Sequence, residues 1–144
     1  MNIRPFQIED EAAVVELWWR CELIRPQNDP HKDIQRKLKV QRELFLVGEN
    51  EGRIVASVMA SYDGHRCWVN YLAVDPNSRR RGLGRALMAE VERLVRERGC
   101  PKINLQARTT NAAVIEFYKR IGFTVDDVVS LGKRLEFDGP MERQ

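Results

Sequence analysis

Apolar and polar residues repeat along this chain with two different periods, which divide it into predicted strands and helices. Two turn sequences, Asn50-Glu51-Gly52 and Asp63-Gly64-His65-Arg66, separate runs rich in β-branched and aromatic residues and predict an antiparallel meander. Further short runs of this kind lie near both ends of the chain. The predicted strands span residues 3–6, 44–49, 53–62, 67–74, 102–107, 123–128 and 129–137.

Helices are predicted where apolar residues recur every three or four positions. Asp10 and Asp29 are suited to cap the first two helices, and Pro30 fits the first position of the second. Gly99 and Gly122 are placed to end the last two. The predicted helices span about residues 11–21, 30–42, 83–98 and 111–121.

The resulting order is β-α-α-β-β-β-α-β-α-β-β, with about seven strands and four helices, which is typical of a mixed α/β layer fold. The sequence has no internal repeat, low-complexity segment or linker. We therefore expect residues 1–144 to form one domain, with a flexible tail of a few residues at the end.

Composition places the chain among globular proteins, since 43% of its 144 residues are apolar and 31% are charged. No run approaches the roughly 20 apolar residues that span a bilayer, and the N-terminus lacks the apolar stretch of a signal peptide. The three cysteines are widely spaced and odd in number, which argues against a disulfide framework and a zinc site. We expect a cytoplasmic protein without a metal.

The net charge of +3 does not demand a nucleic-acid partner, but four arginines gather beside Gly82 and Gly84. A charge run is usually a solvated face. Here, however, the run joins a predicted strand to the start of a helix, where unpaired amide groups and the helix dipole suit a pyrophosphate. The sequence is neither a Walker loop nor a dinucleotide fingerprint. The four arginines are Arg79, Arg80, Arg81 and Arg85.

Residues 79–84 resemble the pyrophosphate-binding motif of the GCN5-related N-acetyltransferase (GNAT) superfamily: Gln or Arg, two residues, Gly, one residue, Gly or Ala. A second signature of this family, Asn followed by Tyr and then Gly-Phe, is similar to Asn111, Tyr118 and residues 122–123. Both motifs occur in order, about thirty residues apart, and the order of elements agrees over roughly residues 1–137.

The resemblance implies a fourth strand that bulges and splays from the fifth, so that the gap receives the pantetheine arm of acetyl-coenzyme A (acetyl-CoA). Tyr118 would protonate the departing thiolate. For the strand residues the alternative is ordinary core packing, for Tyr118 a half-buried helix tyrosine, and for Asn111 a helix cap. The cofactor-binding residues implied are Leu72, Ala73, Val74, Arg79, Arg80, Arg81, Gly82, Leu83, Gly84, Arg85 and Asn111.

The general base is where the chain departs from a related pattern. Residues 105–111 resemble the bacterial acetylases of ribosomal-protein N-terminal alanines, which carry a glutamate where this chain has Gln106. An amide cannot accept a proton, so the base would be Glu22, Asp29, His65 or a chain of waters. A site without an obvious base favours an amine of low pKa.

The acceptor side is expected between the first two helices and the last hairpin, with Arg25, Asn28, Asp29 and Gln106 as candidate contacts. A small polar amine is slightly favoured over a protein N-terminus or a lysine side chain. Two other classes remain open: a non-catalytic coenzyme A sensor, and a basic nucleic-acid-binding domain. We expect no membrane and no nucleic-acid partner, and pairing into a homodimer is possible.

Overall fold

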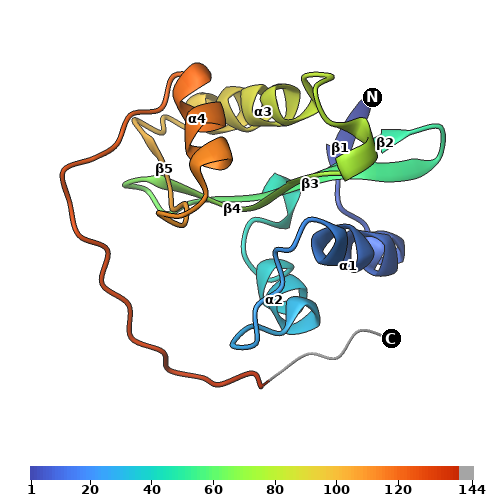
Figure 1. Ribbon diagram of the computed structural model, residues 1–144, viewed down its shortest axis with the longest axis horizontal. Helices are drawn as coiled ribbons and strands as arrows, with labels where there is room; N and C mark the ends of the chain where they lie inside the picture. Colours follow the sequence, from blue (N-terminus) through green and yellow to red (C-terminus); the bar gives the residue numbers. More distant parts are fainter. Residues whose placement is uncertain (140–144) are drawn as a thin grey trace.

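The computed structural model describes residues 1–139, so the tail predicted at the end of the chain lies outside the described residues. Over this range the chain forms five strands, four helices and three short 3-10 turns (Figure 1). The strands are β1 (Asn2–Pro5), β2 (Phe45–Asn50), β3 (Arg53–Tyr62), β4 (Cys67–Val74) and β5 (Ile103–Leu105). The helices are α1 (Glu11–Arg20), α2 (Pro30–Lys37), α3 (Leu83–Glu97) and α4 (Ala112–Arg120).

The strands form one sheet in the order β1-β2-β3-β4-β5. Neighbours from β1 to β4 are antiparallel, which confirms the predicted meander, whereas β5 pairs with β4 in parallel. A parallel neighbour requires a crossover, and α3 supplies it. The sheet is therefore mixed, as the order of elements predicted.

Helices cover both faces of this sheet. In Figure 1, α3 and α4 lie on one face, and α1 and α2 lie on the other. Two apolar clusters fill the spaces between these layers. One joins Leu87, Val91 and other α3 residues to the sheet, and the other is built around Trp18 and Phe45, which are fully buried. The burial of both sheet faces explains why β2 and β3 are almost continuously apolar.

The second helix is shorter than predicted, because α2 ends at Lys37 rather than near Arg42. Two side chains replace the missing helical turn. The ammonium group of Lys37 donates to the carbonyl oxygen of Val40, and Gln41, at a left-handed φ of 50°, exchanges two hydrogen bonds with the backbone of Tyr62 in β3. These contacts turn the chain from α2 towards β2.

The predicted final hairpin is wrong, since residues 124–139 contain no strand and the sheet has five strands instead of about seven. A tight hairpin requires turn residues with positive φ. The two predicted strands meet between Val128 and Val129, with Asp126 and Asp127 near the junction. None of these residues has a positive φ, and neither does Gly132. The segment instead runs extended from the end of α4 towards α2 (Figure 1).

Candidate active site

The fourth strand is distorted at its centre by a β-bulge. Ser57 of β3 pairs with Ala73, but two residues further on Met59 pairs with Asn70. One residue of β3 therefore faces two of β4, the first of which is Tyr71 at a left-handed φ of 53°. This conformation costs a non-glycine residue about 1–2 kcal/mol, so surrounding contacts must hold it. The bulge predicted in this strand is confirmed.

Four side chains hold the bulge in place. The indole nitrogen of Trp18 donates to the hydroxyl of Ser57 at 2.9 Å, and that hydroxyl donates to the carbonyl oxygen of Tyr71 at 3.1 Å. The Tyr71 ring stacks on Trp18 with centroids 3.8 Å apart, and its hydroxyl donates to Asp33 at 2.6 Å. Burial, and then the Asp33 hydrogen bond, raise the pKa of Tyr71 above its ordinary range. The strained backbone of Tyr71 is thus held at its carbonyl oxygen by Ser57, and through its side chain by Trp18 and Asp33.

Pairing between β4 and β5 stops early. The last paired residues are Val69 and Leu105, so β4 residues 70–74 have no strand beside them on that edge. This confirms the expected splay of the two strands. Backbone groups on an open strand edge can bind an extended ligand that carries amides.

The loop after β4 presents further unpaired backbone groups. Gly82, with φ 73°, is the N-cap of α3, and the first helical hydrogen bond runs from the amide of Ala86 to the carbonyl of Gly82. The amides of residues 83–85 therefore have no helical acceptor, and no side chain caps them. Arg80 also has a positive φ, at 66°. Alternating backbone conformations of this kind form concave sites for anions.

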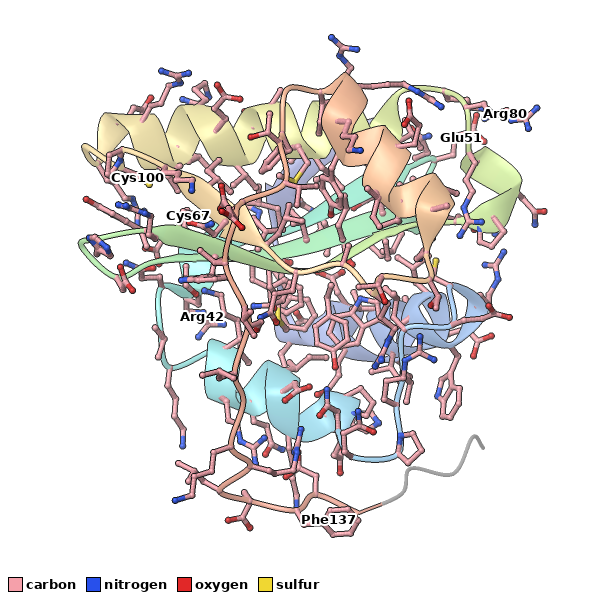
Figure 2. All side chains as sticks on the ribbon, turned by 60° about the vertical axis from the view of Figure 1, so that its left-hand side comes forward. Arg42, Glu51, Cys67, Arg80, Cys100 and Phe137 are labelled. Carbon is pink, nitrogen blue, oxygen red and sulfur yellow. The ribbon has the colours of Figure 1, made fainter. Side chains whose placement is uncertain are left out.

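The arginines of this loop are exposed. Arg79 donates to the carbonyl of Val74 at 3.4 Å. Within residues 1–139, the side chains of Arg80, Arg81 and Arg85 make no hydrogen bond or ion pair, and Arg80 projects away from the body of the protein (Figure 2). They are available to bind an anion at the start of α3.

Asp75 fixes the beginning of this loop to α1. Its carboxylate is buried and accepts two hydrogen bonds from Arg20, at 2.6 and 3.0 Å, and one from the amide of Asn77 at 2.9 Å. Burial opposes ionisation, but the Asn77 amide and the Arg20 guanidinium outweigh it and hold the pKa of Asp75 below its ordinary value. A buried, fully bonded carboxylate makes the loop rigid.

Gly84 brings the two sequence motifs together. A Cβ atom at this position would lie 3.2 Å from the Phe117 ring of α4 and 3.5 Å from Val74 of β4. The glycine therefore lets α4 and the end of β4 pack directly against the first turn of α3. The loop before α3, which resembles the pyrophosphate motif, consequently meets the open edge of β4 and the helix of Tyr118 at one place.

Tyr118 belongs to the core cluster that also includes Leu72, Val74 and Leu105. Its side chain is 9% exposed and packs edge-on against Phe123. Burial raises the pKa of its phenol to about 12. No residue among 1–139 forms a hydrogen bond with its hydroxyl. Asn111 begins the same helix and caps it, because its side chain accepts a hydrogen bond from the amide of Val114 at 3.2 Å.

The predicted acceptor residues are not equally available. Asp29 caps α2 by accepting from the amides of His31 and Lys32, and the Asn28 side chain accepts from Arg134. Arg25 is half-buried, and its side chain has no hydrogen-bond or ion-pair partner in the described part of the chain.

The loop of these residues lies close to the bulge, since Leu23 and Ile24 pack against the cluster that contains Tyr71 and Ala73. Gln106 lies just beyond β5 and hydrogen-bonds to Ser130.

The candidate bases lie in different places. His65 is exposed in the β3–β4 turn, at the opposite end of β4 from the open edge. Glu22 is exposed after α1 at a left-handed φ of 58°. Asp33, which sequence reasoning missed, is the carboxylate that contacts the bulge, but Tyr71 and Arg36 already bond to it. Among the described residues, no three His, Cys, Asp or Glu side chains cluster as a metal site would require.

The chain is similar to proteins of known family. The model of the "Acetyltransferase (GNAT) family" matches residues 12–123. The chain belongs to the GNAT family. An acetyltransferase of Pectobacterium atrosepticum is 50% identical over 135 residues, which cover 94% of this chain and 96% of that protein. The crystal structure of Ard1 from Thermoplasma volcanium is similar with a TM-score of 0.77 and 29% identity, covering 87% of this chain and 83% of that one.

A protein of Clostridium acetobutylicum, described as a predicted acetyltransferase and solved with acetyl-CoA, has a TM-score of 0.70 and 21% identity, covering 91% of this chain and 95% of that one. Membership of the family confirms the predicted enzyme class: this GNAT protein is an acetyl-CoA-dependent N-acetyltransferase. No helix within residues 1–139 is long and apolar enough to cross a membrane.

Sequence reasoning missed the residues that hold the bulge, namely Trp18, Ser57, Tyr71 and Asp33. Trp18 also packs in the buried cluster between the sheet and α1. A bulge is easiest to predict at a glycine, but this GNAT chain uses a tyrosine with positive φ, which leaves no signal in the sequence. Only one feature of the sequence pointed to Asp33. It lies four residues, about one helical turn, after the cap residue Asp29, so the two side chains lie on the same side of α2.

Proposed function

We propose that this protein transfers the acetyl group of acetyl-CoA directly to the nitrogen of a small polar amine. The observation that carries the proposal is the meeting at Gly84 of two sets of backbone groups, one on a strand edge without a neighbouring strand and one at the start of α3. The open edge of β4 at residues 70–74 lies on one side, and the amides of residues 83–85 lie on the other. One ligand with an amide-bearing arm and a pyrophosphate would satisfy both sets.

The pyrophosphate would bind at the start of α3. The three free amides and the positive end of the helix dipole favour negative charge there. Arg80, Arg81 and Arg85 are exposed and unpaired among the described residues, and their guanidinium groups can donate to phosphate oxygens. Gly82 supports this role, because its position has no neighbouring atom within 4 Å of a Cβ.

The thioester would lie beside β4, between the bulge and Tyr118. Attack by the neutral amine forms the new C–N bond, and the backbone amides of β4 would stabilise the oxyanion that develops on the carbonyl. As the C–S bond breaks, Tyr118 would give its proton to the departing sulfur, and water would take the proton released by the amine nitrogen. Tyr118 would then recover its proton from solvent.

No covalent acetyl-enzyme is needed in this scheme. Cys67 is buried, and this burial raises the pKa of its thiol to about 11, so it remains protonated at neutral pH. Cys100 lies after α3 and its sulfur donates to the carbonyl of Lys102. Neither thiol has the histidine partner that would activate a nucleophile.

The acceptor would bind beside the α1–α2 loop, with Arg25 as its recognition residue. A half-buried arginine without a partner in the described chain offers a planar pair of donors that fits a carboxylate. Asn28 and Asp29 are already engaged, which leaves Arg25 as the contact. An α-amine costs about 1.4 kcal/mol to deprotonate at pH 7, whereas a lysine side chain costs about 4.6 kcal/mol, so a site without a strong base favours an amino-acid-like acceptor.

A thiol-release assay with acetyl-CoA across a panel of amines tests the proposal. We expect turnover with amino-acid-like amines, and we expect Arg25→Ala to raise the KM for the acceptor while the KM for acetyl-CoA stays unchanged. Arg42→Ala is the control, because Arg42 is an exposed arginine outside the α1–α2 loop, in η2 (Arg42–Leu44). Acetyl-CoA binding without turnover on any amine would instead identify a coenzyme A sensor. Acetylation of folded proteins alone would exclude the small acceptor.

A further inference from the structure

The segment after α4 is an extended arm, residues 124–139, which runs past β5 to reach the start of α2 (Figure 1). It forms neither helix nor strand over this range. Apolar and polar residues alternate along it with the period of a β-strand. The even-numbered face of the arm is therefore polar except for Val128 and Gly132, and the odd-numbered face is apolar except for Asp127 and Lys133.

The polar face holds the arm against its own chain near β5. Asp126 accepts hydrogen bonds from Lys102 at 2.8 Å and from Asn104 at 3.0 Å. Ser130, four residues later, accepts a hydrogen bond from Gln106. Both contacts come from even-numbered positions of the arm, on the same face.

The same face holds the arm to α2 at its far end. Arg134 donates to the carbonyl of Gln27 at 2.8 Å and to the side chain of Asn28 at 2.6 Å. Asp138 accepts two hydrogen bonds from Arg36, at 2.9 and 3.0 Å. The arm is thus fixed at four points, always through the polar face, so the apolar face is held outwards.

Five odd-numbered positions of the apolar face carry large hydrophobic side chains that are 70–91% exposed. This is unusual for a monomer, because single exposed residues are common but a row of several large exposed apolar side chains marks a contact surface. Figure 2 shows Phe137 at the outer end of the arm, on the side of the protein that carries α2. The stripe consists of Val125, Val129, Leu131, Leu135 and Phe137.

The arm does not bury this stripe against the described residues 1–139. Gly132 lacks the positive φ of a tight turn, so the arm passes straight through the position where it could fold back. A hollow of about 540 Å³, lined by Arg36 and residues 132–136, separates this part of the arm from α2. No part of residues 1–139 therefore covers the apolar face.

We propose that the occupant of this face is a second copy of this protein, and that the two arms stack face to face in antiparallel directions around Ser130. The apolar face is complementary to itself in this arrangement, because apolar side chains face apolar ones and the two charged positions face each other. The facing pairs are Val125 with Leu135, Val129 with Leu131, and Asp127 with Lys133.

Charge supports this choice of partner. Asp127 and Lys133 are the charged residues of the apolar face between Val125 and Leu135, and both are exposed. Neither forms a hydrogen bond or an ion pair within residues 1–139. A two-fold axis at Ser130 places each opposite its complement in the other copy. Such a symmetric contact uses one surface patch on both subunits, as closed dimers do.

The area of the stripe is also sufficient. At about 100 Å² of apolar surface per side chain, five side chains in each of two copies bury about 1,000 Å², which meets the lower limit for a specific interface. Phe137 of one copy would extend beyond the stripe towards Phe123 of the other, which lies half-buried beside Tyr118.

Light scattering after size-exclusion chromatography tests the proposal at micromolar concentration. We expect the wild-type protein to be a dimer, and Val129→Asp and Leu131→Asp to be monomers with unchanged circular dichroism, since both side chains are exposed. Val40→Asp is the matched control, because Val40 is 55% exposed outside the arm; this variant should stay dimeric. A monomeric wild type would overturn the proposal, and so would dimeric arm variants.

Charge reversal tests the antiparallel register separately. Asp127→Lys and Lys133→Asp each place like charges opposite one another at two points, and each should weaken dimerisation by about tenfold or more. Mixing the two variants should restore a heterodimer, because every facing pair is then opposite in charge. Failure of the mixture to associate better than either variant alone would exclude this register.

Discussion

At the scale of single residues, the phenol of Tyr118 stays protonated throughout the neutral range, because burial raises its pKa to about 12. A thiol has an ordinary pKa of about 8.5, so complete transfer of the proton to the departing sulfur would be uphill by about 5 kcal/mol. The transfer can therefore assist only as charge develops on the sulfur. A proton donor of this kind contributes a moderate factor and cannot act as the base.

The Tyr118→Phe variant should keep its affinity for acetyl-CoA and lose about one to two orders of magnitude in kcat, within the range of general acids. The ring and its packing against Phe123 remain, and only the proton donor is removed. Single-turnover kinetics and calorimetry with acetyl-CoA measure the two effects separately. Wild-type kcat in a folded variant would remove Tyr118 from the mechanism. In the wild-type enzyme, no loss of activity from Tyr118 ionisation is expected between pH 7 and 10.

At the scale of elements, the start of α3 was the part of the site most accessible to sequence reasoning. Glycines and arginines at a strand–helix junction indicate an anion site from their residue types alone, and Gly82 has a left-handed φ that glycine adopts readily. Binding of a pyrophosphate there stays a prediction. The bulge beside it was expected only from the family resemblance. Its supports, Ser57 and Tyr71, depend on contacts between residues distant in the sequence, which periodicity does not reveal.

The arm shows the opposite limit of sequence reasoning. Its alternating pattern correctly indicated extended backbone, but the same pattern led to two strands that do not form. Alternation reports that one face of a segment is apolar, and it does not report what covers that face. The end of α2 was predicted wrongly for a related reason. Lys37 and Gln41 form hydrogen bonds with β3, and these contacts end the helix earlier than its own sequence indicates.

Gly82→Val tests the role of the α3 start at this scale. The position has φ 73° and no atom within 4 Å of a Cβ, so the variant should fold with a modest loss of stability and place a branched side chain beside the free amides. We expect acetyl-CoA binding to be lost in calorimetry. Gly64→Val, in the β3–β4 turn, is a matched control with φ 93° and equally open space. It should lose similar stability and keep its affinity; unchanged affinity in Gly82→Val would place the pyrophosphate elsewhere.

At the scale of the whole molecule, the two helical layers are tied to the sheet by buried polar contacts as well as by the two apolar clusters. Asp75 joins α1 to the loop that begins α3. On the other side, Lys37 of α2 is 7% exposed, and its ammonium group donates to the carbonyl of Ala60 and to the hydroxyl of Ser61 in β3. A buried charge without a carboxylate partner within hydrogen-bonding reach is costly. Its titration therefore affects the stability of the whole fold.

The stability of the protein should rise with pH through the range in which Lys37 titrates. Burial lowers the pKa of Lys37 to about 8 in the folded protein, whereas an unfolded chain has the ordinary lysine value of about 10.4. Between these values the unfolded chain binds the extra proton, so the free energy of unfolding increases with pH, by up to about 3 kcal/mol from this group. Lys37→Met removes the titrating group while it keeps the length of the side chain. Urea unfolding of both proteins at pH 7.0 and 9.5 measures the difference: the wild type should gain stability relative to the variant at the higher pH. An equal response of the two proteins would mean that Lys37 titrates normally and that its ammonium group is solvated in solution.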